Sequence, residues 1–377
     1  MTDTTRSTEL TAAPPLLMAL ELGSTKWTLG FTTRTAEGTR IRRINAGDTP
    51  ALEKEIWLAK TRLALPLDAP VASCYEAGRD GFWIHRWLEA RAVHNVVVDS
   101  ASIEVNRRAR RAKTDRLDVV KLVAMLKRFH SGERVWSVVR VPSPEAEADR
   151  QLTREIATVR EDRKRARFRM QSLLATQGIR LQIGRAFLGH LAVALTGDGR
   201  PLAAAFQQRL TREWEHWRDI NARLQRLMTA RDEAIAIGAD RVTTIARQLC
   251  QLRGIAETGA AVLSAELFAT RTFTNGRQLG ALLGLVPVPY RSDQRVSDQG
   301  ISKAGRTEVR RVAVQLAWCW LRWQPTSALA QWYRQRFEGA GGRSKRVGIV
   351  AVARKLMIAL WRYVAQGRLP DGALVKT

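Results

Sequence analysis

Short apolar runs of strand length alternate with helix-length segments in the first third of the chain, and this order constrains the fold most strongly. Glycine-containing turns separate the earliest runs, and a proline follows the first helical segment. The predicted elements are, in order, strands over 17–22, 27–33 and 40–46, a helix over 51–65, a strand over 71–75, a helix over 82–92, a strand over 95–99 and a helix over 115–129. Hairpins followed by crossovers predict a mixed sheet flanked by helices.

The pattern changes at Pro144, after which apolar residues recur at spacings of three, four and seven. Two highly charged segments, 152–177 and 206–228, carry such heptad-like seams, and a glycine-containing connector over 178–201 separates them. We expect an antiparallel helical pair or arms that pair between subunits. A charged helix packed within one chain explains the pattern equally well.

The last third of the chain is predicted to be mainly helical. Residues 249–267 have the apolar and glycine spacing of a helix-hairpin-helix, although Ala256 stands where a second turn glycine is usual. A packed helix-turn-helix without a DNA contact is the alternative. A proline-broken apolar helix end, a polar and basic loop with glycines, and a tryptophan-rich helix follow. For the tryptophans (Trp318, Trp320, Trp323 and Trp332), helical spacing favours core packing over stacking on bases.

The 377 residues are therefore divided into a disordered tail over 1–15, an α/β domain over 16–143, a coiled-coil region over 144–238 and a mainly helical C-terminal domain over 239–377. The predicted fold class is α/β plus all-α. Its first part is a RuvC-like, ribonuclease-H-like mixed sheet, for which the acidic residues below give the reason.

The charge balance points to a polyanionic partner. Lysine and arginine number 62 against 36 acidic residues, a net charge of +26, which indicates nucleic acid first and an anionic membrane second. No stretch approaches the roughly 18 apolar residues of a spanning helix. Three widely spaced cysteines form no disulfide or metal pattern. We expect a soluble, cytoplasmic protein without a membrane partner.

Four acidic residues stand where a metal site is expected. Glu21 and Glu76 end predicted strands, whereas Asp115 and Asp118 begin a predicted helix and share one of its faces. Mg²⁺ prefers oxygen ligands, and a pair of such ions stabilises both the attacking and the leaving oxygen of a phosphodiester. The order predicts a ribonuclease-H-like nuclease or integrase core. The alternatives are a solvent-facing Glu21 and a first-turn Asp115 after a Thr114 cap.

Basic residues cluster beside these acids and again near the C-terminal loop. One cluster precedes Asp115, one runs over residues 160–169, and one follows residue 300. The residues predicted to bind nucleic acid are Arg107, Arg108, Arg110, Arg111, Lys113, Lys303, Arg306 and Arg310. A solvated basic helix face is the alternative for any single run.

The chain resembles the insertion-sequence transposases related to the Piv-type DNA invertases, which are bridge-RNA-guided serine recombinases. The resemblance rests on KTDRLDVVKL, YEAGRDGFW, LRGIAETGAAVLSAEL and LGLVPVPYRSDQRVSDQGISKAGRTEVRR, the last typical of the GISKAG branch. It implies a RuvC-like domain with metal ligands Glu21, Glu76, Asp115 and Asp118, and a nucleophilic serine at Ser292, with Ser297 as fallback. Glu21 replaces the usual aspartate, and Asp293 replaces the usual glycine after the serine.

The resemblance also implies a mechanism and partners. Mg²⁺, in a two-metal site, would favour attack by Ser292 and a covalent phosphoserine–DNA intermediate. The partners would be donor and target double-stranded DNA, a structured guide RNA and further copies of the chain, as a dimer of dimers associated with the nucleoid. Two alternatives stay open: a RuvC-like structure-specific nuclease that uses water, and a non-catalytic nucleic-acid-binding relic.

Overall fold

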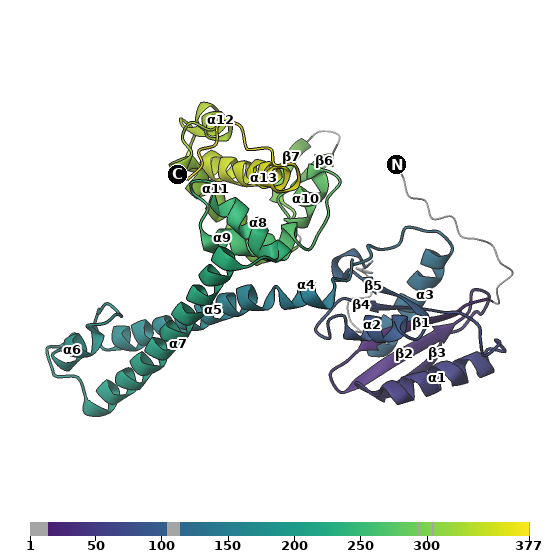
Figure 1. Ribbon diagram of the computed structural model, residues 1–377. Coiled ribbons are helices and arrows are strands. Elements are labelled where there is room, and N and C mark those ends of the chain that lie inside the picture. Colours follow the sequence, from purple (N-terminus) through teal and green to yellow (C-terminus); the bar gives the residue numbers. More distant parts are fainter. Residues whose placement is uncertain (1–13, 104–113, 293–294, 304, 377) are drawn as a thin grey trace. The chain divides into compact units, whose positions relative to one another are not determined.

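The computed structural model describes residues 14–103, 114–292, 295–303 and 305–376 (Figure 1). The chain forms two compact units, Met1–Val141 and Pro142–Thr377. The first is a mixed α/β unit and the second is mainly helical. Within the described residues, no helix combines the length and apolar character that crossing a bilayer requires.

One five-stranded mixed sheet forms the centre of the first unit, in the order β3-β2-β1-β4-β5. Strands β1 (Leu16–Leu22), β2 (Lys26–Thr32) and β3 (Arg40–Asn45) are antiparallel neighbours. Strands β4 (Val71–Glu76) and β5 (Val93–Val98) continue the sheet parallel to β1. The crossovers contain α1 (Thr49–Arg62) and α2 (Trp83–Glu89). The predicted strands, helices and mixed sheet of this unit are confirmed.

The two faces of this sheet are covered by different helices. In β1, Leu16, Met18 and Leu20 pack in one cluster with residues of α1 and α2. The alternate residues Leu17 and Ala19 pack in a second cluster with α3 (Asp115–His130). Because side chains alternate along a strand, each position of β1 and β4 is assigned to one of these faces.

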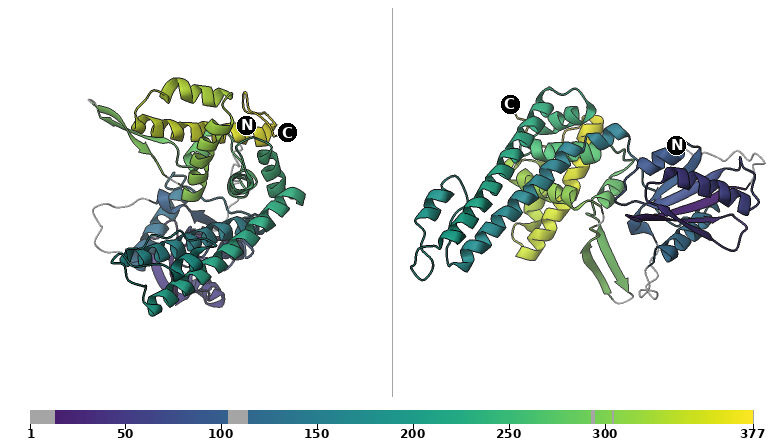
Figure 2. Two further views of the ribbon diagram at one scale, coloured as in Figure 1. Left: turned by 90° about the vertical axis from the view of Figure 1, so that its left-hand side faces the viewer. Right: turned by 90° about the horizontal axis from the view of Figure 1, so that it is seen from below.

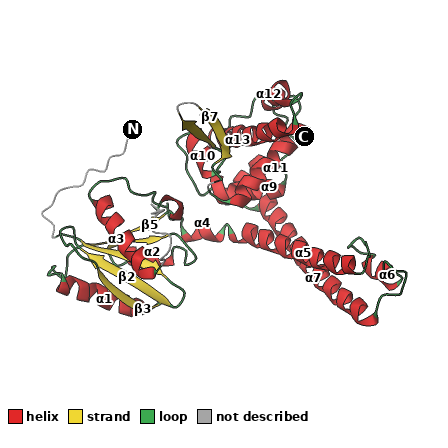
Figure 3. Ribbon diagram, turned by 180° about the vertical axis from the view of Figure 1, so that it is seen from behind, coloured by secondary structure: helices red, strands yellow, loops and turns green. Residues whose placement is uncertain are grey.

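Two long helices open the second unit and pack against each other (Figure 3). They are α5 (Gln151–Thr176) and α7 (Ala204–Ile237), preceded by α4 (Pro144–Ala148) and joined through α6 (Phe187–Ala192). Apolar residues of the predicted seams are buried between them, among them Ile156, Val159 and Leu224. The pairing therefore occurs within one chain, as the predicted antiparallel pair requires.

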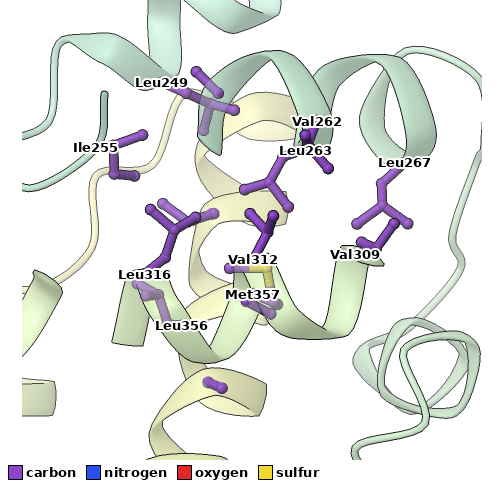
Figure 4. Close-up of a cluster of buried hydrophobic side chains, with 14 of the residues drawn as sticks. Leu249, Ile255, Val262, Leu263, Leu267, Val309, Val312, Leu316, Leu356 and Met357 are labelled. Carbon is purple, nitrogen blue, oxygen red and sulfur yellow. The ribbon is translucent and has the colours of Figure 1, made fainter. Parts of the chain in front are cut away.

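A helical core forms the rest of the unit (Figure 4). Its elements are α8 (Arg241–Cys250), α9 (Glu257–Leu263), the π-helical turn η2 (Ser264–Phe268), α10 (Gly276–Leu282), β6 (Pro287–Ser292), β7 (Arg295–Ile301), α11 (Thr307–Trp323), α12 (Ala328–Phe337) and α13 (Gly342–Gln366). Val262, Leu263 and Leu267 pack against Val309 and Leu316 of α11 in one cluster. The helix-hairpin-helix-like segment is thus built into the core, which favours its packing role.

The segment predicted as a polar loop forms a hairpin instead. Strands β6 and β7 pair antiparallel, from Pro287 opposite Ile301 to Ser292 opposite Arg295 (Figure 2). The loop prediction was wrong because the prolines and polar residues of this segment are typical of loops, yet the two strands pair with each other. The core-packing prediction for the tryptophans holds for Trp320, which is buried, but not for Trp318 and Trp323, which are exposed on α11.

Gly305, which precedes α11, cannot be replaced without strain. Its φ is +72°, and a Cβ atom there would lie 2.0 Å from the carbonyl oxygen of Leu282. We expect Gly305→Ala to lower the free energy of unfolding by about 2–4 kcal/mol, because left-handed strain and overpacking add. Gly300→Ala is the control, since Gly300 has φ of +88° but open space around its Cβ position. Chemical denaturation of both variants measures this, and equal losses would contradict the predicted steric clash.

Candidate active site

Two predicted acidic residues meet at one edge of the mixed sheet. Glu21 lies near the end of β1 and Glu76 ends β4, and both line a pocket of about 200 Å³. The strands are parallel, and the register places Leu20 opposite Tyr75, one position before the two glutamates. Glu21 is half-buried, whereas Glu76 is exposed. The carboxyl ends of two neighbouring parallel strands therefore contribute two glutamate side chains to the same pocket.

Both glutamates belong to the face of the sheet that α3 covers. Leu17 and Ala19 of β1, and Ala72 and Cys74 of β4, pack with α3, so the two-residue alternation puts Glu21 and Glu76 on that face. Thr28 of β2 pairs with Glu21 across the ladder and points to the same side. Its hydroxyl oxygen is buried and, among the described residues, has no hydrogen-bond partner. The Thr28 hydroxyl oxygen on β2 is therefore a further polar group on the same side of the sheet as its ladder partner Glu21.

Asp115 and Asp118 lie in the first turn of α3, where the sequence placed them. The Thr114 side chain caps this helix by accepting from the Leu117 amide, so the predicted capping arrangement is present. Asp115 is exposed, and its Oδ2 lies 3.8 Å from Nη2 of Arg43. Among the described residues, no group of three acidic, histidine or cysteine side chains is close enough to hold one metal ion. The structure therefore brings Glu21 and Glu76 together without adding the aspartates to a common cluster.

Sequence reasoning missed two residues of this pocket. Arg79 and Asp80 line it together with the glutamates, and Arg79 Nη2 lies 3.5 Å from Asp80 Oδ2. They follow β4 in the YEAGRDGFW segment. Their closeness to the end of this strand is the feature of the sequence that could have identified them as pocket residues. A guanidinium beside carboxylates suits a phosphate group that approaches a metal.

The donor set at this edge fits Mg²⁺. This ion keeps several waters and is bound in proteins by one or two carboxylates plus substrate phosphates, not by complete protein cages. Glu21 and Glu76 supply two carboxylates, and the open side of the pocket leaves room for water and phosphate oxygens. These two carboxylates could therefore hold one ion without Asp115 and Asp118, in the manner that Mg²⁺ sites commonly use.

The structure gives different surroundings to the predicted nucleic-acid-binding residues. Arg107, Arg108, Arg110, Arg111 and Lys113 lie outside the described residues. Lys303 is exposed. Arg310 donates to the carbonyl oxygens of Lys303 and Leu283, at 3.0 and 3.4 Å. Arg310 therefore ties the segment before α11 to the end of α10, in addition to any role on DNA.

Arg306 forms an ion pair with a buried carboxylate. The Glu266 side chain in η2 is 4% exposed, and its Oε2 lies 2.5 Å from Nη1 of Arg306. Arg154 contacts both oxygens of Glu266, at 3.0 and 3.4 Å, and Arg150 lies 3.9 Å away. Burial opposes ionisation of Glu266, but the Arg154 hydrogen bond and the charge of Arg306 hold the pKa of this carboxyl below its ordinary value. Glu266 thus links the start of α5 to the start of α11.

The predicted serines lie on the hairpin. Ser292 ends β6 and is paired with Arg295, whereas Ser297 lies within β7 opposite Tyr290. Asp293 lies outside the described residues. Ser292 is therefore the last described residue before the hairpin connection, at its tip.

Comparisons with known proteins place the chain among transposases. The model of the "Transposase IS116/IS110/IS902 family" matches residues 246–332. In Sinorhizobium fredii (strain NBRC 101917 / NGR234), "Putative transposase y4rJ" is 40% identical over 319 residues, which are 82% of this chain and 80% of the relative. "Putative transposase y4qE" of the same strain is 26% identical over 78% of this chain and 75% of the relative. The "Transposase for insertion sequence element IS1328" of Yersinia enterocolitica is 28% identical over 56% of this chain and 60% of the relative.

These matches correct the family assigned from the sequence motifs. The resemblance to Piv-invertase-related serine recombinases of the GISKAG branch was wrong, because the matching family is the IS116/IS110/IS902 family, which is of the DEDD, RuvC-like type. The GISKAG segment of this chain has a local structural explanation. Its last residue, Gly305, adopts a positive φ and lies close to the backbone of Leu282, and the next residue, Arg306, forms an ion pair with Glu266.

Proposed function

Because this chain belongs to the IS116/IS110/IS902 family of transposases, we propose that it cuts and rejoins DNA at the carboxyl ends of β1 and β4. The observation that carries this proposal is the pocket shared by Glu21 and Glu76. The sheet order and the parallel β1–β4 pair agree with a RuvC-like nuclease core. The family supports the reaction class, and the shared pocket supports the proposed location of the reaction.

In this proposal Glu21 and Glu76 hold Mg²⁺ by their carboxylate oxygens. The ion, when bound, polarises the scissile phosphate and stabilises the charge that develops on its oxygens. Arg79, in the same pocket, orients a non-bridging phosphate oxygen, and Asp80 keeps that guanidinium in place. Asp115 and Asp118, on the helix that covers this face, would complete a second metal position when DNA is bound.

The attacking hydroxyl has two candidates, Ser292 and water. Ser292 is one candidate because it ends β6 next to the hairpin connection, and a two-stranded ribbon can approach a DNA backbone at such an end. Attack by its Oγ on phosphorus would form a phosphoserine bond and release the 3′ or 5′ oxygen of the cut strand. Attack by water would release free DNA ends, as in a structure-specific nuclease. A nucleic-acid-binding relic would do neither.

Further partners are also part of the proposal. The net charge of +26 supports contact with donor and target duplexes and with a structured guide RNA, since each neutralised phosphate contributes to affinity. Assembly into a dimer of dimers would bring the cutting sites of two element ends together.

Covalent capture distinguishes the chemical routes. The full chain, expressed with its native flanking DNA, is mixed with Mg²⁺ and labelled element-end DNA and run on a denaturing gel. We expect cleavage by the wild type that depends on Mg²⁺. A protein–DNA adduct that Ser292→Ala removes and Ser297→Ala retains would establish the serine route. Free cleaved ends, equal in wild type and Ser292→Ala, would establish attack by water. Binding without cleavage would leave the relic and sink the proposed function.

A further inference from the structure

A basic groove lies on the second unit. It is lined mainly by α5, with one residue each from α7 and α11, and has a volume of about 580 Å³. We call it the α5 groove. Its cationic side chains are Arg160, Arg163, Lys164, Arg167 and Arg311. Glu161 is the one carboxylate among its described lining residues, so the groove is strongly positive.

The helical repeat explains how one face of α5 becomes so basic. Arg160, Arg163, Lys164 and Arg167 are spaced by three, four and seven residues, which places them on a single stripe. The fold then adds Arg311 from α11 to the same groove. The basic surface therefore extends beyond the single face of α5.

Contacts within the chain leave much of this charge uncompensated. Arg160 donates to the Thr258 hydroxyl at 3.2 Å, and Arg163 donates to Oδ1 of Asn221 at 3.1 Å, both neutral acceptors. The carboxylates nearby are loosely engaged, since Lys164 lies 3.9 Å from Glu161 and Arg311 lies 4.0 Å from Glu308.

The crowding of guanidinium groups has an electrostatic consequence. The pKa of Arg160 lies below its ordinary value, first because the group is partly buried and then because Arg231, Arg163 and Arg311 repel its charge. A bound anion would relieve this repulsion.

An exposed aromatic ring in the groove indicates which kind of anion the groove would bind. Phe168 follows Arg167, lines the groove and is 54% exposed, with Lys164 Nζ 5.8 Å from its ring centroid. Basic grooves with aromatic platforms bind single strands, because unpaired bases stack on the ring while cations contact the phosphates. In a duplex the base faces are already stacked and cannot use such a ring.

We propose that the α5 groove binds an unpaired DNA strand, with phosphates on Arg163, Arg167 and Arg311 and a base stacked on Phe168. The inference rests on the proposed function, since a transposase is what brings DNA to this chain. Its role would be to hold a strand that has been opened at an element end.

Binding by the full chain tests this proposal. Labelled unpaired DNA of about twenty nucleotides, the matching duplex and an RNA of the same sequence are titrated by fluorescence anisotropy at several salt concentrations. We expect Arg163→Gln with Arg167→Gln to weaken binding of unpaired DNA at least tenfold and to reduce the salt slope by about 1.4. Phe168→Ala should weaken it about tenfold, and Phe168→Tyr should restore it.

Matched controls separate this inference from folding and from cleavage. Arg226→Gln removes an exposed cation of α7 that is not among the residues lining the groove, and it should change binding less than twofold. Glu76→Gln should bind unpaired DNA as the wild type does, even where cleavage is lost, so the two proposals fail independently. Three results would overturn the proposed strand site. The groove variants could lose affinity for duplex DNA or RNA as strongly as for unpaired DNA, or they could bind unpaired DNA as the wild type does. The third result is a changed oligomeric state of Phe168→Ala.

Discussion

Glu76→Gln is expected to abolish transposition while leaving the protein folded. The substitution removes one of the two carboxylates that would hold Mg²⁺ in the proposed site, and loss of several kcal/mol of metal stabilisation would lower the rate of strand cutting by about 10³-fold or more. Glu76 is exposed at the end of β4, so its replacement should change the free energy of unfolding by less than about 0.5 kcal/mol. Excision of a marked element in cells and cleavage of element-end DNA measure the effect.

Glu37→Gln is the matched control, because Glu37 is an exposed glutamate between β2 and β3 of the same unit and does not line the pocket. It should retain full transposition. Asp115→Asn tests the second metal position: a loss as large as that of Glu76→Gln supports it, whereas near-normal transposition leaves Asp115 as a first-turn acid beside Arg43. Normal transposition by Glu76→Gln would contradict the proposed site.

Glu266→Ala is expected to lower the free energy of unfolding by about 3–5 kcal/mol, because it leaves buried guanidinium charge without its partner. Arg150 is itself 9% exposed at its side chain, and Arg154 and Arg306 converge on the same carboxylate. The loss should also loosen the segment that contains Gly305 and Arg306. Denaturant unfolding followed by circular dichroism gives the magnitude.

An exposed ion pair in the same unit provides the comparison. Glu155 lies 2.5 Å from Arg223, but both side chains are largely exposed, so Glu155→Gln should cost about 1 kcal/mol or less. The pH dependence has a definite sign. Because the folded pKa of Glu266 lies below the ordinary value of 4.5, its contribution is present above that value and is lost as pH falls through the folded pKa. Equal costs for Glu266→Ala and Glu155→Gln would contradict the role assigned to the buried carboxylate.

The spacing of apolar residues and the length of each apolar segment were sufficient to predict most of the fold. The apolar run of β1, whose residues Leu16–Leu20 are buried on both faces of the sheet, is visible in the sequence as a strand-length segment, and so is the seam that buries Ile156 and Val159. The β6–β7 hairpin was missed because prolines in β6 suggested a loop. The exposure of Trp318 and Trp323 was also missed, because helical spacing gives relative angles and does not identify which side of α11 faces the core.

The candidate site was only partly predictable, for a related reason. Glu21 and Glu76 could be joined from sequence because both end strands of one parallel pair, whose register fixes their proximity. No such register relates Asp115 and Asp118 to the sheet, since a long segment separates β5 from α3. The basic run of α5 was visible as charge, but Arg311 joined it only through packing, and the pairing of Arg306 with Glu266 depends on a buried turn.

Metal binding at the sheet edge tests the proposed catalytic site most directly. Mn²⁺, as a spectroscopic substitute for Mg²⁺, is titrated into the full chain with element-end DNA and followed by electron paramagnetic resonance. We expect a bound Mn²⁺ signal in the wild type and in Glu37→Gln that is lost in Glu21→Gln with Glu76→Gln, with Mg²⁺ competing in the wild type. An undiminished signal in the double variant would contradict a metal site at the ends of β1 and β4.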